Sequence, residues 1–471
     1  MNFTPLPARS FAFLLQQALE RILRLRAFLR EIKNLSNPED IRLVEFHEIH
    51  VNKALSTIND RLSDLDALFS NKIHVGKTQL STIWAFNTYF LIVHFRLRLL
   101  VALPSIEPEV YVFLGDFFRE PIIRPTVVYS SYHNYAELDL IEHFQGDIDV
   151  TDNLPGSATP DNGKVVLLLP YVARNDPLMW VNLLHEMGHA YAAKIKVWDL
   201  VKDVVGKPEA VAITRRWVIE YFADFLSLRL AGPAYLCGFI NWILCQTPNQ
   251  IISTKTHPSP VKRVRYMRRY LEDAKPVVQT NACSFLCEIF EDVVRICGLS
   301  GDDPSLATPL ISEDAMVAKV AELGAEHASL FSEPFGSAHL SDVHLLTEIC
   351  EKGLPVSSKH LKSESDIRTS LGGLLAKKTL TADELYLAAG SLEEVPNHAS
   401  TIVNVGWENR VGKLLDVFAT IFCDEKRSAE QKIAVYGADM ENSDAKLQRS
   451  LEVARLHGLW RSGSGTQHVA K

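Results

Sequence analysis

Residues 176–196 read DPLMWVNLLHEMGHAYAAKIK, and this stretch determines how the rest of the chain is interpreted. An aspartate followed by a proline is typical of a helix start, because aspartate caps free N–H groups and proline suits the first helical position. The apolar residues that follow predict a helix over 178–196. That helix carries an H-E-x-x-H pattern formed by His185, Glu186 and His189.

Histidines four positions apart on a helix lie on one face, because the intervening rotation is about 400° and the rise about 6 Å. His185 and His189 can therefore bind one zinc ion together. Glu186 lies about 100° further round the helix. We expect it to stand beside the metal without binding it and to take a proton from the zinc-bound water as a general base.

A catalytic zinc site needs a third protein ligand and one open position, and Glu220 is the candidate ligand. It lies 31 residues after His189 in a second predicted helix, 210–231, and Asp224 follows one turn later on the same side. A carboxylate there can accept the other ring N–H of a zinc-bound histidine. The neighbouring residues 217–225 are mostly apolar, and carboxylates in such surroundings need a partner.

These motifs, with Thr256-His257-Pro258-Ser259-Pro260 and Arg263 further along, resemble the gluzincin metallopeptidases of the HtpX and CAAX prenyl-protease type over about residues 175–270. Members of that family carry H-E-x-x-H, E-x-x-A-D and T-H-P-x-x-x-x-R. The resemblance implies a zincin-like catalytic domain and one zinc ion. It also implies the following roles: zinc ligands His185, His189 and Glu220, general base Glu186, and Asp224 behind a ligating histidine.

Two differences separate the chain from that family. Many members are membrane proteins, and their interval between the second histidine and the glutamate is longer. The E-x-x-A-D motif followed by an apolar helix is also similar to the soluble ImmA/IrrE-type peptidases, which cut repressors inside bacteria, although that group does not explain the T-H-P-S-P segment. The chemistry is shared between the two resemblances, and the substrate is not.

His257 is a candidate for hydrogen bonding to the oxyanion of the transition state, because such sites need an electrophilic group besides zinc. The alternative is a capping and packing role at the start of the next helix. Tyr171 and Tyr191 are weaker candidates for the same task. The arginines of the next helix read either as a nucleic-acid stripe or as a solvated or ion-paired face, and the acidic composition favours the second. They are Arg263, Arg265, Arg268 and Arg269.

The composition argues against several other kinds of protein. The formal charge is −8, so nucleic acid is not an expected partner. Seven cysteines without a C-x-x-C pair and the lack of a secretory signal indicate a reducing, cytoplasmic location. Cys283 and Cys287 are interpreted as core thiols. The most apolar stretch, 83–103, contains Asn87, Arg96 and Arg98, so no membrane span is expected.

The hydrophobic pattern predicts a mainly helical α+β protein. Helices are expected at 11–32, 41–69 and 79–103, strands at 110–114, 122–130, 138–150 and 164–171, and a strand or turn at 400–405. The last strand before the H-E-x-x-H helix is expected to be an edge that aligns the substrate. Loop 151–163 has the composition and length of a lid. The predicted domains are an N-terminal helical region at 1–105, a zincin-like metallopeptidase domain at 106–299 and a C-terminal helical domain at 310–460, with a linker at 300–309 and a disordered tail at 461–471.

The sequence therefore predicts an intracellular zinc endopeptidase that hydrolyses peptide bonds of a specific protein or peptide substrate. Two alternatives remain besides the ImmA/IrrE-like repressor-cleaving peptidase. One is a catalytically inactive zincin-fold protein that binds or regulates a partner, and the other is a zinc hydrolase acting on non-peptide bonds. The sequence leaves the oligomeric state open.

Overall fold

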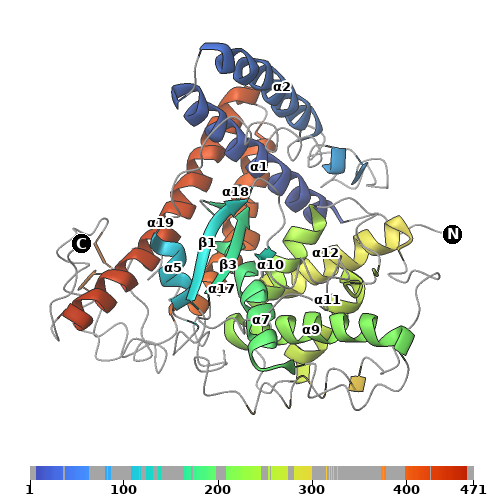
Figure 1. Cartoon of the computed structure of the whole chain (residues 1–471). Coiled ribbons are helices and arrows are strands. Elements are labelled where there is room, and N and C mark those ends of the chain that lie inside the picture. Colours follow the sequence, from blue (N-terminus) through green and yellow to red (C-terminus); the bar gives the residue numbers. More distant parts are fainter. Residues whose placement is uncertain are drawn as a thin grey trace.

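The structure is a computed structural model of the chain, and it is mostly helical (Figure 1). It describes residues 7–35, 38–62, 108–115, 124–130, 136–138, 164–170, 176–197, 208–245, 256–273, 280–299, 398–424 and 426–463, with isolated positions between them. The α-helices are α1 (Ala8–Leu35), α2 (Pro38–Leu62), α5 (Pro108–Gly115), α7 (Asn182–Lys194), α9 (Pro208–Ala231), α10 (Pro233–Leu244), α11 (Pro260–Asp273), α12 (Asn281–Cys297), α17 (His398–Asn409), α18 (Leu415–Phe422) and α19 (Ala429–Gly463). A 3₁₀ turn, η2 (Pro177–Met179), and a π-helix, η7 (Arg410–Leu414), complete the helical elements of the described chain.

A small sheet lies beside the central helices. Strand β1 (Arg124–Ser130) runs parallel to β3 (Lys164–Pro170), and β2 (Ala136–Leu138) pairs with β3 in the antiparallel sense. The order is β1-β3-β2, and α7 packs against β2 and β3. The expectation that the strand at 164–171 is an edge is wrong, because β1 and β2 occupy its two sides. Its apolar run, VVLLL, is typical of a strand inside a sheet, and Leu167 and Leu169 are buried.

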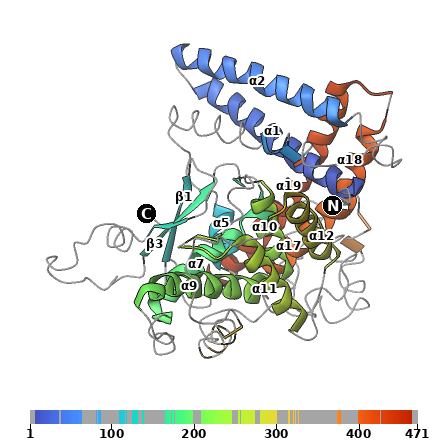
Figure 2. The same cartoon turned by 90° about the vertical axis from the view of Figure 1, so that its right-hand side faces the viewer.

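Helices of the N-terminal and C-terminal regions pack against each other, as α1 does on α18 and α19. Helices α1 and α2 pack together at one end of the molecule, and α19 runs from there past α5 and the sheet (Figures 1 and 2). Helix α17 contacts η2, α9 and α10, which are the elements around the H-E-x-x-H helix. Buried residues of the N-terminal, central and C-terminal helices form one continuous hydrophobic core. The described parts of the predicted helical regions thus support the central helices directly.

A ring of buried charges joins these distant segments. Asp176 accepts hydrogen bonds from Arg24 of α1, at 2.7 Å, and from both terminal nitrogens of Arg410, at 3.1 Å each. Asp444 of α19 accepts from the same two arginines, at 2.7 and 3.4 Å. Asp176 therefore does not cap the helix start as the sequence predicted, and its side chain makes no capping hydrogen bond. Instead, its hydrogen bonds link the start of the H-E-x-x-H helix to Arg24 of α1 and to Arg410 of η7.

Of the other secondary-structure predictions, some are confirmed and some are wrong. The helix at 210–231 and the strand at 122–130 are confirmed as α9 and β1. The helix expected from residue 178 is divided into η2 and α7. The strand predictions at 110–114 and 400–405 are wrong, because these residues lie in α5 and α17. A short apolar run has no periodicity that separates a strand from a buried helix.

Several predicted segments lie outside the described residues. They are most of 79–103 and of the strand at 138–150, the loop at 151–163, the linker at 300–309, most of the domain at 310–460 before residue 398, and the tail after residue 463. Within the described helices, none is long and apolar enough to cross a membrane.

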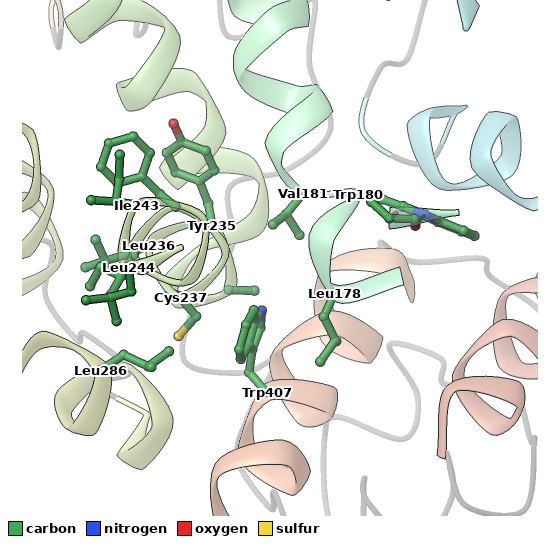
Figure 3. Close-up of a cluster of buried hydrophobic side chains, with 14 of the residues drawn as sticks. Leu178, Trp180, Val181, Tyr235, Leu236, Cys237, Ile243, Leu244, Leu286 and Trp407 are labelled. Atoms are coloured by element: carbon green, nitrogen blue, oxygen red, sulfur yellow. Dashed lines mark hydrogen bonds between the residues drawn. The ribbon is translucent and has the colours of Figure 1, made fainter. Parts of the chain in front are cut away.

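Helix α10 is the centre of the core behind the site. Its buried apolar side chains pack on α12 and α17, as Figure 3 shows for Cys237 beside Leu286 and Trp407. Tyr235 leaves the helix on the side opposite to Cys237 (Figure 3). The helix begins after Gly232, whose φ of 60° is a conformation that L side chains rarely adopt. Glycine at this position lets α9 end and α10 begin without an intervening loop.

Candidate metal centre

Helix α7 presents two histidines toward α9, as the H-E-x-x-H spacing predicts. The ring centroids of His185 and His189 are 4.6 Å apart, and their Nε2 atoms are 3.0 Å apart. His185 is buried, and the side chain of His189 keeps 19% of its surface exposed. Two imidazole nitrogens from one helix therefore meet at a point that is partly open.

The glycine within the motif permits α7 and α9 to approach each other closely. A Cβ atom on Gly188 would lie 2.6 Å from the Cα and 2.8 Å from the Cβ of Ala223. These distances are well inside van der Waals contact, so only glycine fits here without a shift of backbone. The small residues of H-E-x-G-H and E-x-x-A-D thus pack against each other, and their contact brings Glu220 to the histidines.

Glu220 of α9 completes a group of three candidate ligands. One oxygen lies 3.3 Å from Nε2 of His185, and the other lies 3.5 Å from Nε2 of His189. One ligand atom from each of the three residues lies within 4.8 Å of the others. This is the single group of three histidine, cysteine or acidic residues with that spacing among the described residues. The sequence prediction that His185, His189 and Glu220 come together is confirmed as a group able to hold a metal ion.

The separations within this group are close to those of ligands around one metal ion. Metal–ligand bonds of about 2.0–2.1 Å place neighbouring tetrahedral ligands about 3.3 Å apart. The two Nε2 atoms are 3.0 Å apart, and they lie 3.3 and 3.5 Å from the two different oxygens of Glu220, so each imidazole has one carboxylate oxygen near that distance. Oε2 of Glu220 is buried and makes no hydrogen bond of acceptable geometry, although Nη1 of Arg263 is 3.1 Å away. Two imidazoles and one carboxylate are also a donor set that catalytic zinc sites use.

Behind the histidines, Asp224 holds the far side of His185. Its Oδ1 lies 3.1 Å from Nδ1 of His185, as predicted for a carboxylate that orients a metal ligand. Arg263 of α11 donates to both oxygens of Asp224, at 2.7 Å from Nε and 2.6 Å from Nη2. The hydroxyl of Tyr235 donates to Oδ1 at 2.6 Å. Every one of these side chains is buried.

The electrostatics of the metal-free site keep the carboxylates ionised. Burial opposes ionisation, but electrostatic interactions with His257 and Arg263 hold the pKa of Glu220 well below its usual range. Burial likewise opposes ionisation of Asp224, and Arg263 outweighs it and lowers the pKa of Asp224 to about 2. Two buried anions therefore face the histidines at neutral pH.

The two histidines differ in protonation. Burial lowers the pKa of His189 to about 4. Burial and the charge of Arg263 act on His185 in the same direction, but hydrogen bonds to Asp224 and Glu220 prevail and raise the pKa of His185 to about 9. Metal-free His185 therefore carries a second proton at neutral pH, and its Nε2–H faces both Glu220 and the neutral Nε2 of His189. A metal ion held here would replace that proton.

Glu186 is partly exposed beside the group. Burial raises its pKa, and the nearby negative charge of Glu220 acts in the same direction. A carboxylate with a raised pKa is a better proton acceptor at neutral pH than an ordinary one. The position next to His185 agrees with the expected general base, which does not belong to the three-ligand group.

His257 reaches the site from the loop before α11. Its Nε2 lies 3.1 Å from Oε1 of Glu220, and its side chain is 56% exposed. Thr256 Oγ1 lies 2.7 Å from its Nδ1. The structure thus places His257 at the open side of the group, where a role toward the oxyanion stays a prediction. Tyr191 is fully buried in the core, and Tyr171 lies outside the described residues.

The arginines of α11 separate into two sets. Arg268 pairs with Glu272 and Glu291, and Arg269 pairs with Asp314, so the ion-paired interpretation is confirmed for both. Arg263 is also ion-paired, with Asp224 and Glu220, but it is buried and does not belong to a solvated helix face.

Sequence reasoning named Arg263 as part of the T-H-P-x-x-x-x-R motif, without its contact to Asp224, and it missed the place of Tyr235. The signal for Arg263 was therefore that motif. Tyr235 stands in an unbroken apolar stretch, and nothing local distinguishes it from a core tyrosine.

Comparisons with protein-family models, with curated proteins and with solved structures find no match to this chain.

Proposed function

We propose that this chain is an intracellular zinc endopeptidase that hydrolyses peptide bonds of a specific protein substrate. The observation that carries the proposal is the meeting of His185, His189 and Glu220 in a group that could hold one metal ion, with Glu186 beside them. The resemblance of the three motifs to gluzincin peptidases supports the same conclusion. The six described cysteines are free thiols, which agrees with a reducing compartment such as the cytoplasm.

Each side chain of the site would have a separate role in hydrolysis. A bound zinc ion would lower the pKa of a coordinated water to about 7 and polarise a carbonyl group. Glu186 would accept a proton from the attacking water at its carboxylate and return it to the leaving amine. Asp224 would keep His185 oriented through its Nδ1–H. His257, at the open side, would donate a hydrogen bond to the oxyanion.

The test combines metal content with one substitution. Elemental analysis of the purified full chain should find one zinc ion per molecule. With denatured protein or a lysate as substrate, Glu186→Gln should lower turnover by at least about 10²-fold while keeping the zinc. Glu288→Gln is the matched control, because Glu288 lies exposed on α12 and away from the group.

The outcomes separate the proposal from its alternatives. A protein that binds zinc but cuts no peptide bond, with or without Glu186, is a zincin-like binding protein. Activity confined to small esters or amides indicates a zinc hydrolase of another class. Loss of zinc in Glu186→Gln, or cleavage at the parental rate, would show that Glu186 is not the base.

A further inference from the structure

Tyr235 contacts the candidate metal site, although it lies outside the three sequence motifs. Its side chain is fully buried on α10. The hydroxyl is 2.6 Å from Oδ1 of Asp224 and 3.2 Å from Nδ1 of His185. The phenol ring lies almost parallel to the imidazole of His185, at an interplanar angle of 9°. Tyr235 thus touches both the candidate ligand and the carboxylate that orients it.

The groups around Asp224 determine which atoms donate hydrogen bonds and which accept them. The carboxylate already receives two N–H groups of Arg263, so it is ionised and can only accept. The hydroxyl of Tyr235 therefore donates to Asp224, and the short contact of 3.1 Å between Nδ1 of His185 and the same oxygen favours a hydrogen on Nδ1 over the longer approach of Nη2 of Arg263, at 3.4 Å. With Nδ1 protonated, the Nε2 lone pair of His185 is the one available to a metal ion. The hydrogen bond from Tyr235 holds Asp224 in the position that fixes this tautomer.

The place of Tyr235 depends in turn on a helix from far along the chain. Asn404 of α17 is buried, and its Oδ1 accepts the backbone N–H of Ala234 at 2.9 Å. Its Nδ2 donates to the carbonyl of Ala231 at 2.7 Å. One amide side chain therefore satisfies the last turn of α9 and the first turn of α10, on either side of Gly232. Tyr235 is the next residue after this anchor.

We propose that Tyr235 is a positioning residue for the metal-holding His185, and that Asn404 of the C-terminal region sets its place. The inference rests on the proposed function, because it takes His185 as a ligand. It also gives α17 a role in the site, which is to hold Tyr235 in position behind His185. The sequence alone leaves the purpose of the C-terminal helices unexplained.

The test compares two tyrosines that differ in one respect. Tyr235→Phe removes a hydroxyl that makes two contacts with the site. Tyr266→Phe removes a buried hydroxyl that makes no hydrogen bond within the described chain. Zinc affinity would be measured on the full chain by competition with a chelator, and cobalt(II) absorption would report the ligand geometry. Unfolding of the metal-free proteins would be measured in parallel.

We expect Tyr235→Phe to weaken zinc affinity about 10-fold or more and to alter the cobalt spectrum, while Tyr266→Phe changes neither. Equal zinc affinity and an equal cobalt spectrum in Tyr235→Phe and the parent would overturn the inference and leave the proposed function standing. Failure of the parent chain to bind one zinc ion would defeat both. A purely structural role would lower stability of the metal-free protein without moving the cobalt spectrum.

The contribution of α17 is tested by a double-mutant cycle. Asn404→Ala should weaken zinc affinity in the parent chain and have a much smaller effect in the Tyr235→Phe background, because the two act through one contact. Additive effects would show that α17 does not act through Tyr235. If Asn404→Ala does not fold, Asn404→Ser retains a smaller polar group for the same cycle.

Discussion

The close packing of Gly188 on Ala223 makes a strong prediction about one methyl group. In Gly188→Ala, the new Cβ would stand 2.6 Å from a backbone atom of α9, whereas ordinary contact begins near 3.4 Å. The two helices must then separate by about 0.8 Å. Zinc sites tolerate deviations of about 0.2 Å in ligand distances. We therefore expect Gly188→Ala to lose most of its zinc.

The same substitution has two opposing effects on folding. Replacing glycine by alanine inside a helix stabilises by about 1 kcal/mol. Overpacking against a backbone that cannot yield costs about 1–3 kcal/mol. The expected net result is a loss of up to about 2 kcal/mol in the free energy of unfolding, measured by chemical denaturation of the metal-free protein.

Gly437→Ala in α19 is the matched control. There a Cβ would lie 3.6 Å from Cδ1 of Leu23, which is ordinary contact, so only the gain in helix propensity remains. Ala223→Gly in the Gly188→Ala background should restore part of the zinc affinity by removing one of the two clashing atoms. If Gly188→Ala equals Gly437→Ala in stability and binds zinc like the parent, the reasoning about helix approach is refuted.

Two further predictions concern the ligands and the buried charges. Glu220→Ala should abolish stoichiometric zinc binding, whereas Asp224→Asn should weaken zinc affinity by about 10–100-fold. Both effects would be measured by competition with a chelator. Full zinc occupancy after Glu220→Ala would show that Glu220 is not a ligand. Burial opposes ionisation of Asp176, but Arg24 and Arg410 lower its pKa, so its contribution to stability is fully present above the unfolded value near 3.8 and is lost as the pH falls through the lower pKa of the folded protein. Asp176→Asn should then cost about 3–5 kcal/mol at pH 7 in denaturant titrations, and the cost should shrink as the pH falls below 3.8; a cost that does not change with pH would contradict the ion-pair assignment.

The sequence predicts the part of the site that depends on helical periodicity. His185 and His189 share a face because they are one turn apart, and Glu220 and Asp224 do so for the same reason. Small residues at Gly188 and Ala223 carry the further information that the two helices touch. These features are local, so the residue pattern on two segments is enough to anticipate the group.

Contacts between distant segments are not visible in such patterns. Arg24 and Arg410 lie 386 positions apart, yet both bind Asp176. The sequence assigned Asp176 a local capping role, because capping needs only neighbours in the chain. The central position of β3 likewise depends on which strands flank it, and strand order is a tertiary property. Short apolar runs such as 400–405 fail for a related reason, since burial on all sides erases the period that separates helix from strand.

The charges of the metal-free site balance within the residues that surround it. Asp224 is matched by the buried guanidinium of Arg263, and Glu220 faces the protonated His185. A buried anion without a partner is costly, so this pairing lets α7, α9 and α11 pack before any metal is bound. Replacing the proton on His185 by a divalent ion adds one positive charge to the group. The raised pKa of Glu186, caused first by burial, then becomes significant, because a carboxylate beside that added charge ionises more readily. A divalent ion held by the group would therefore favour the ionised carboxylate of Glu186, which is the form that the proposed general base requires.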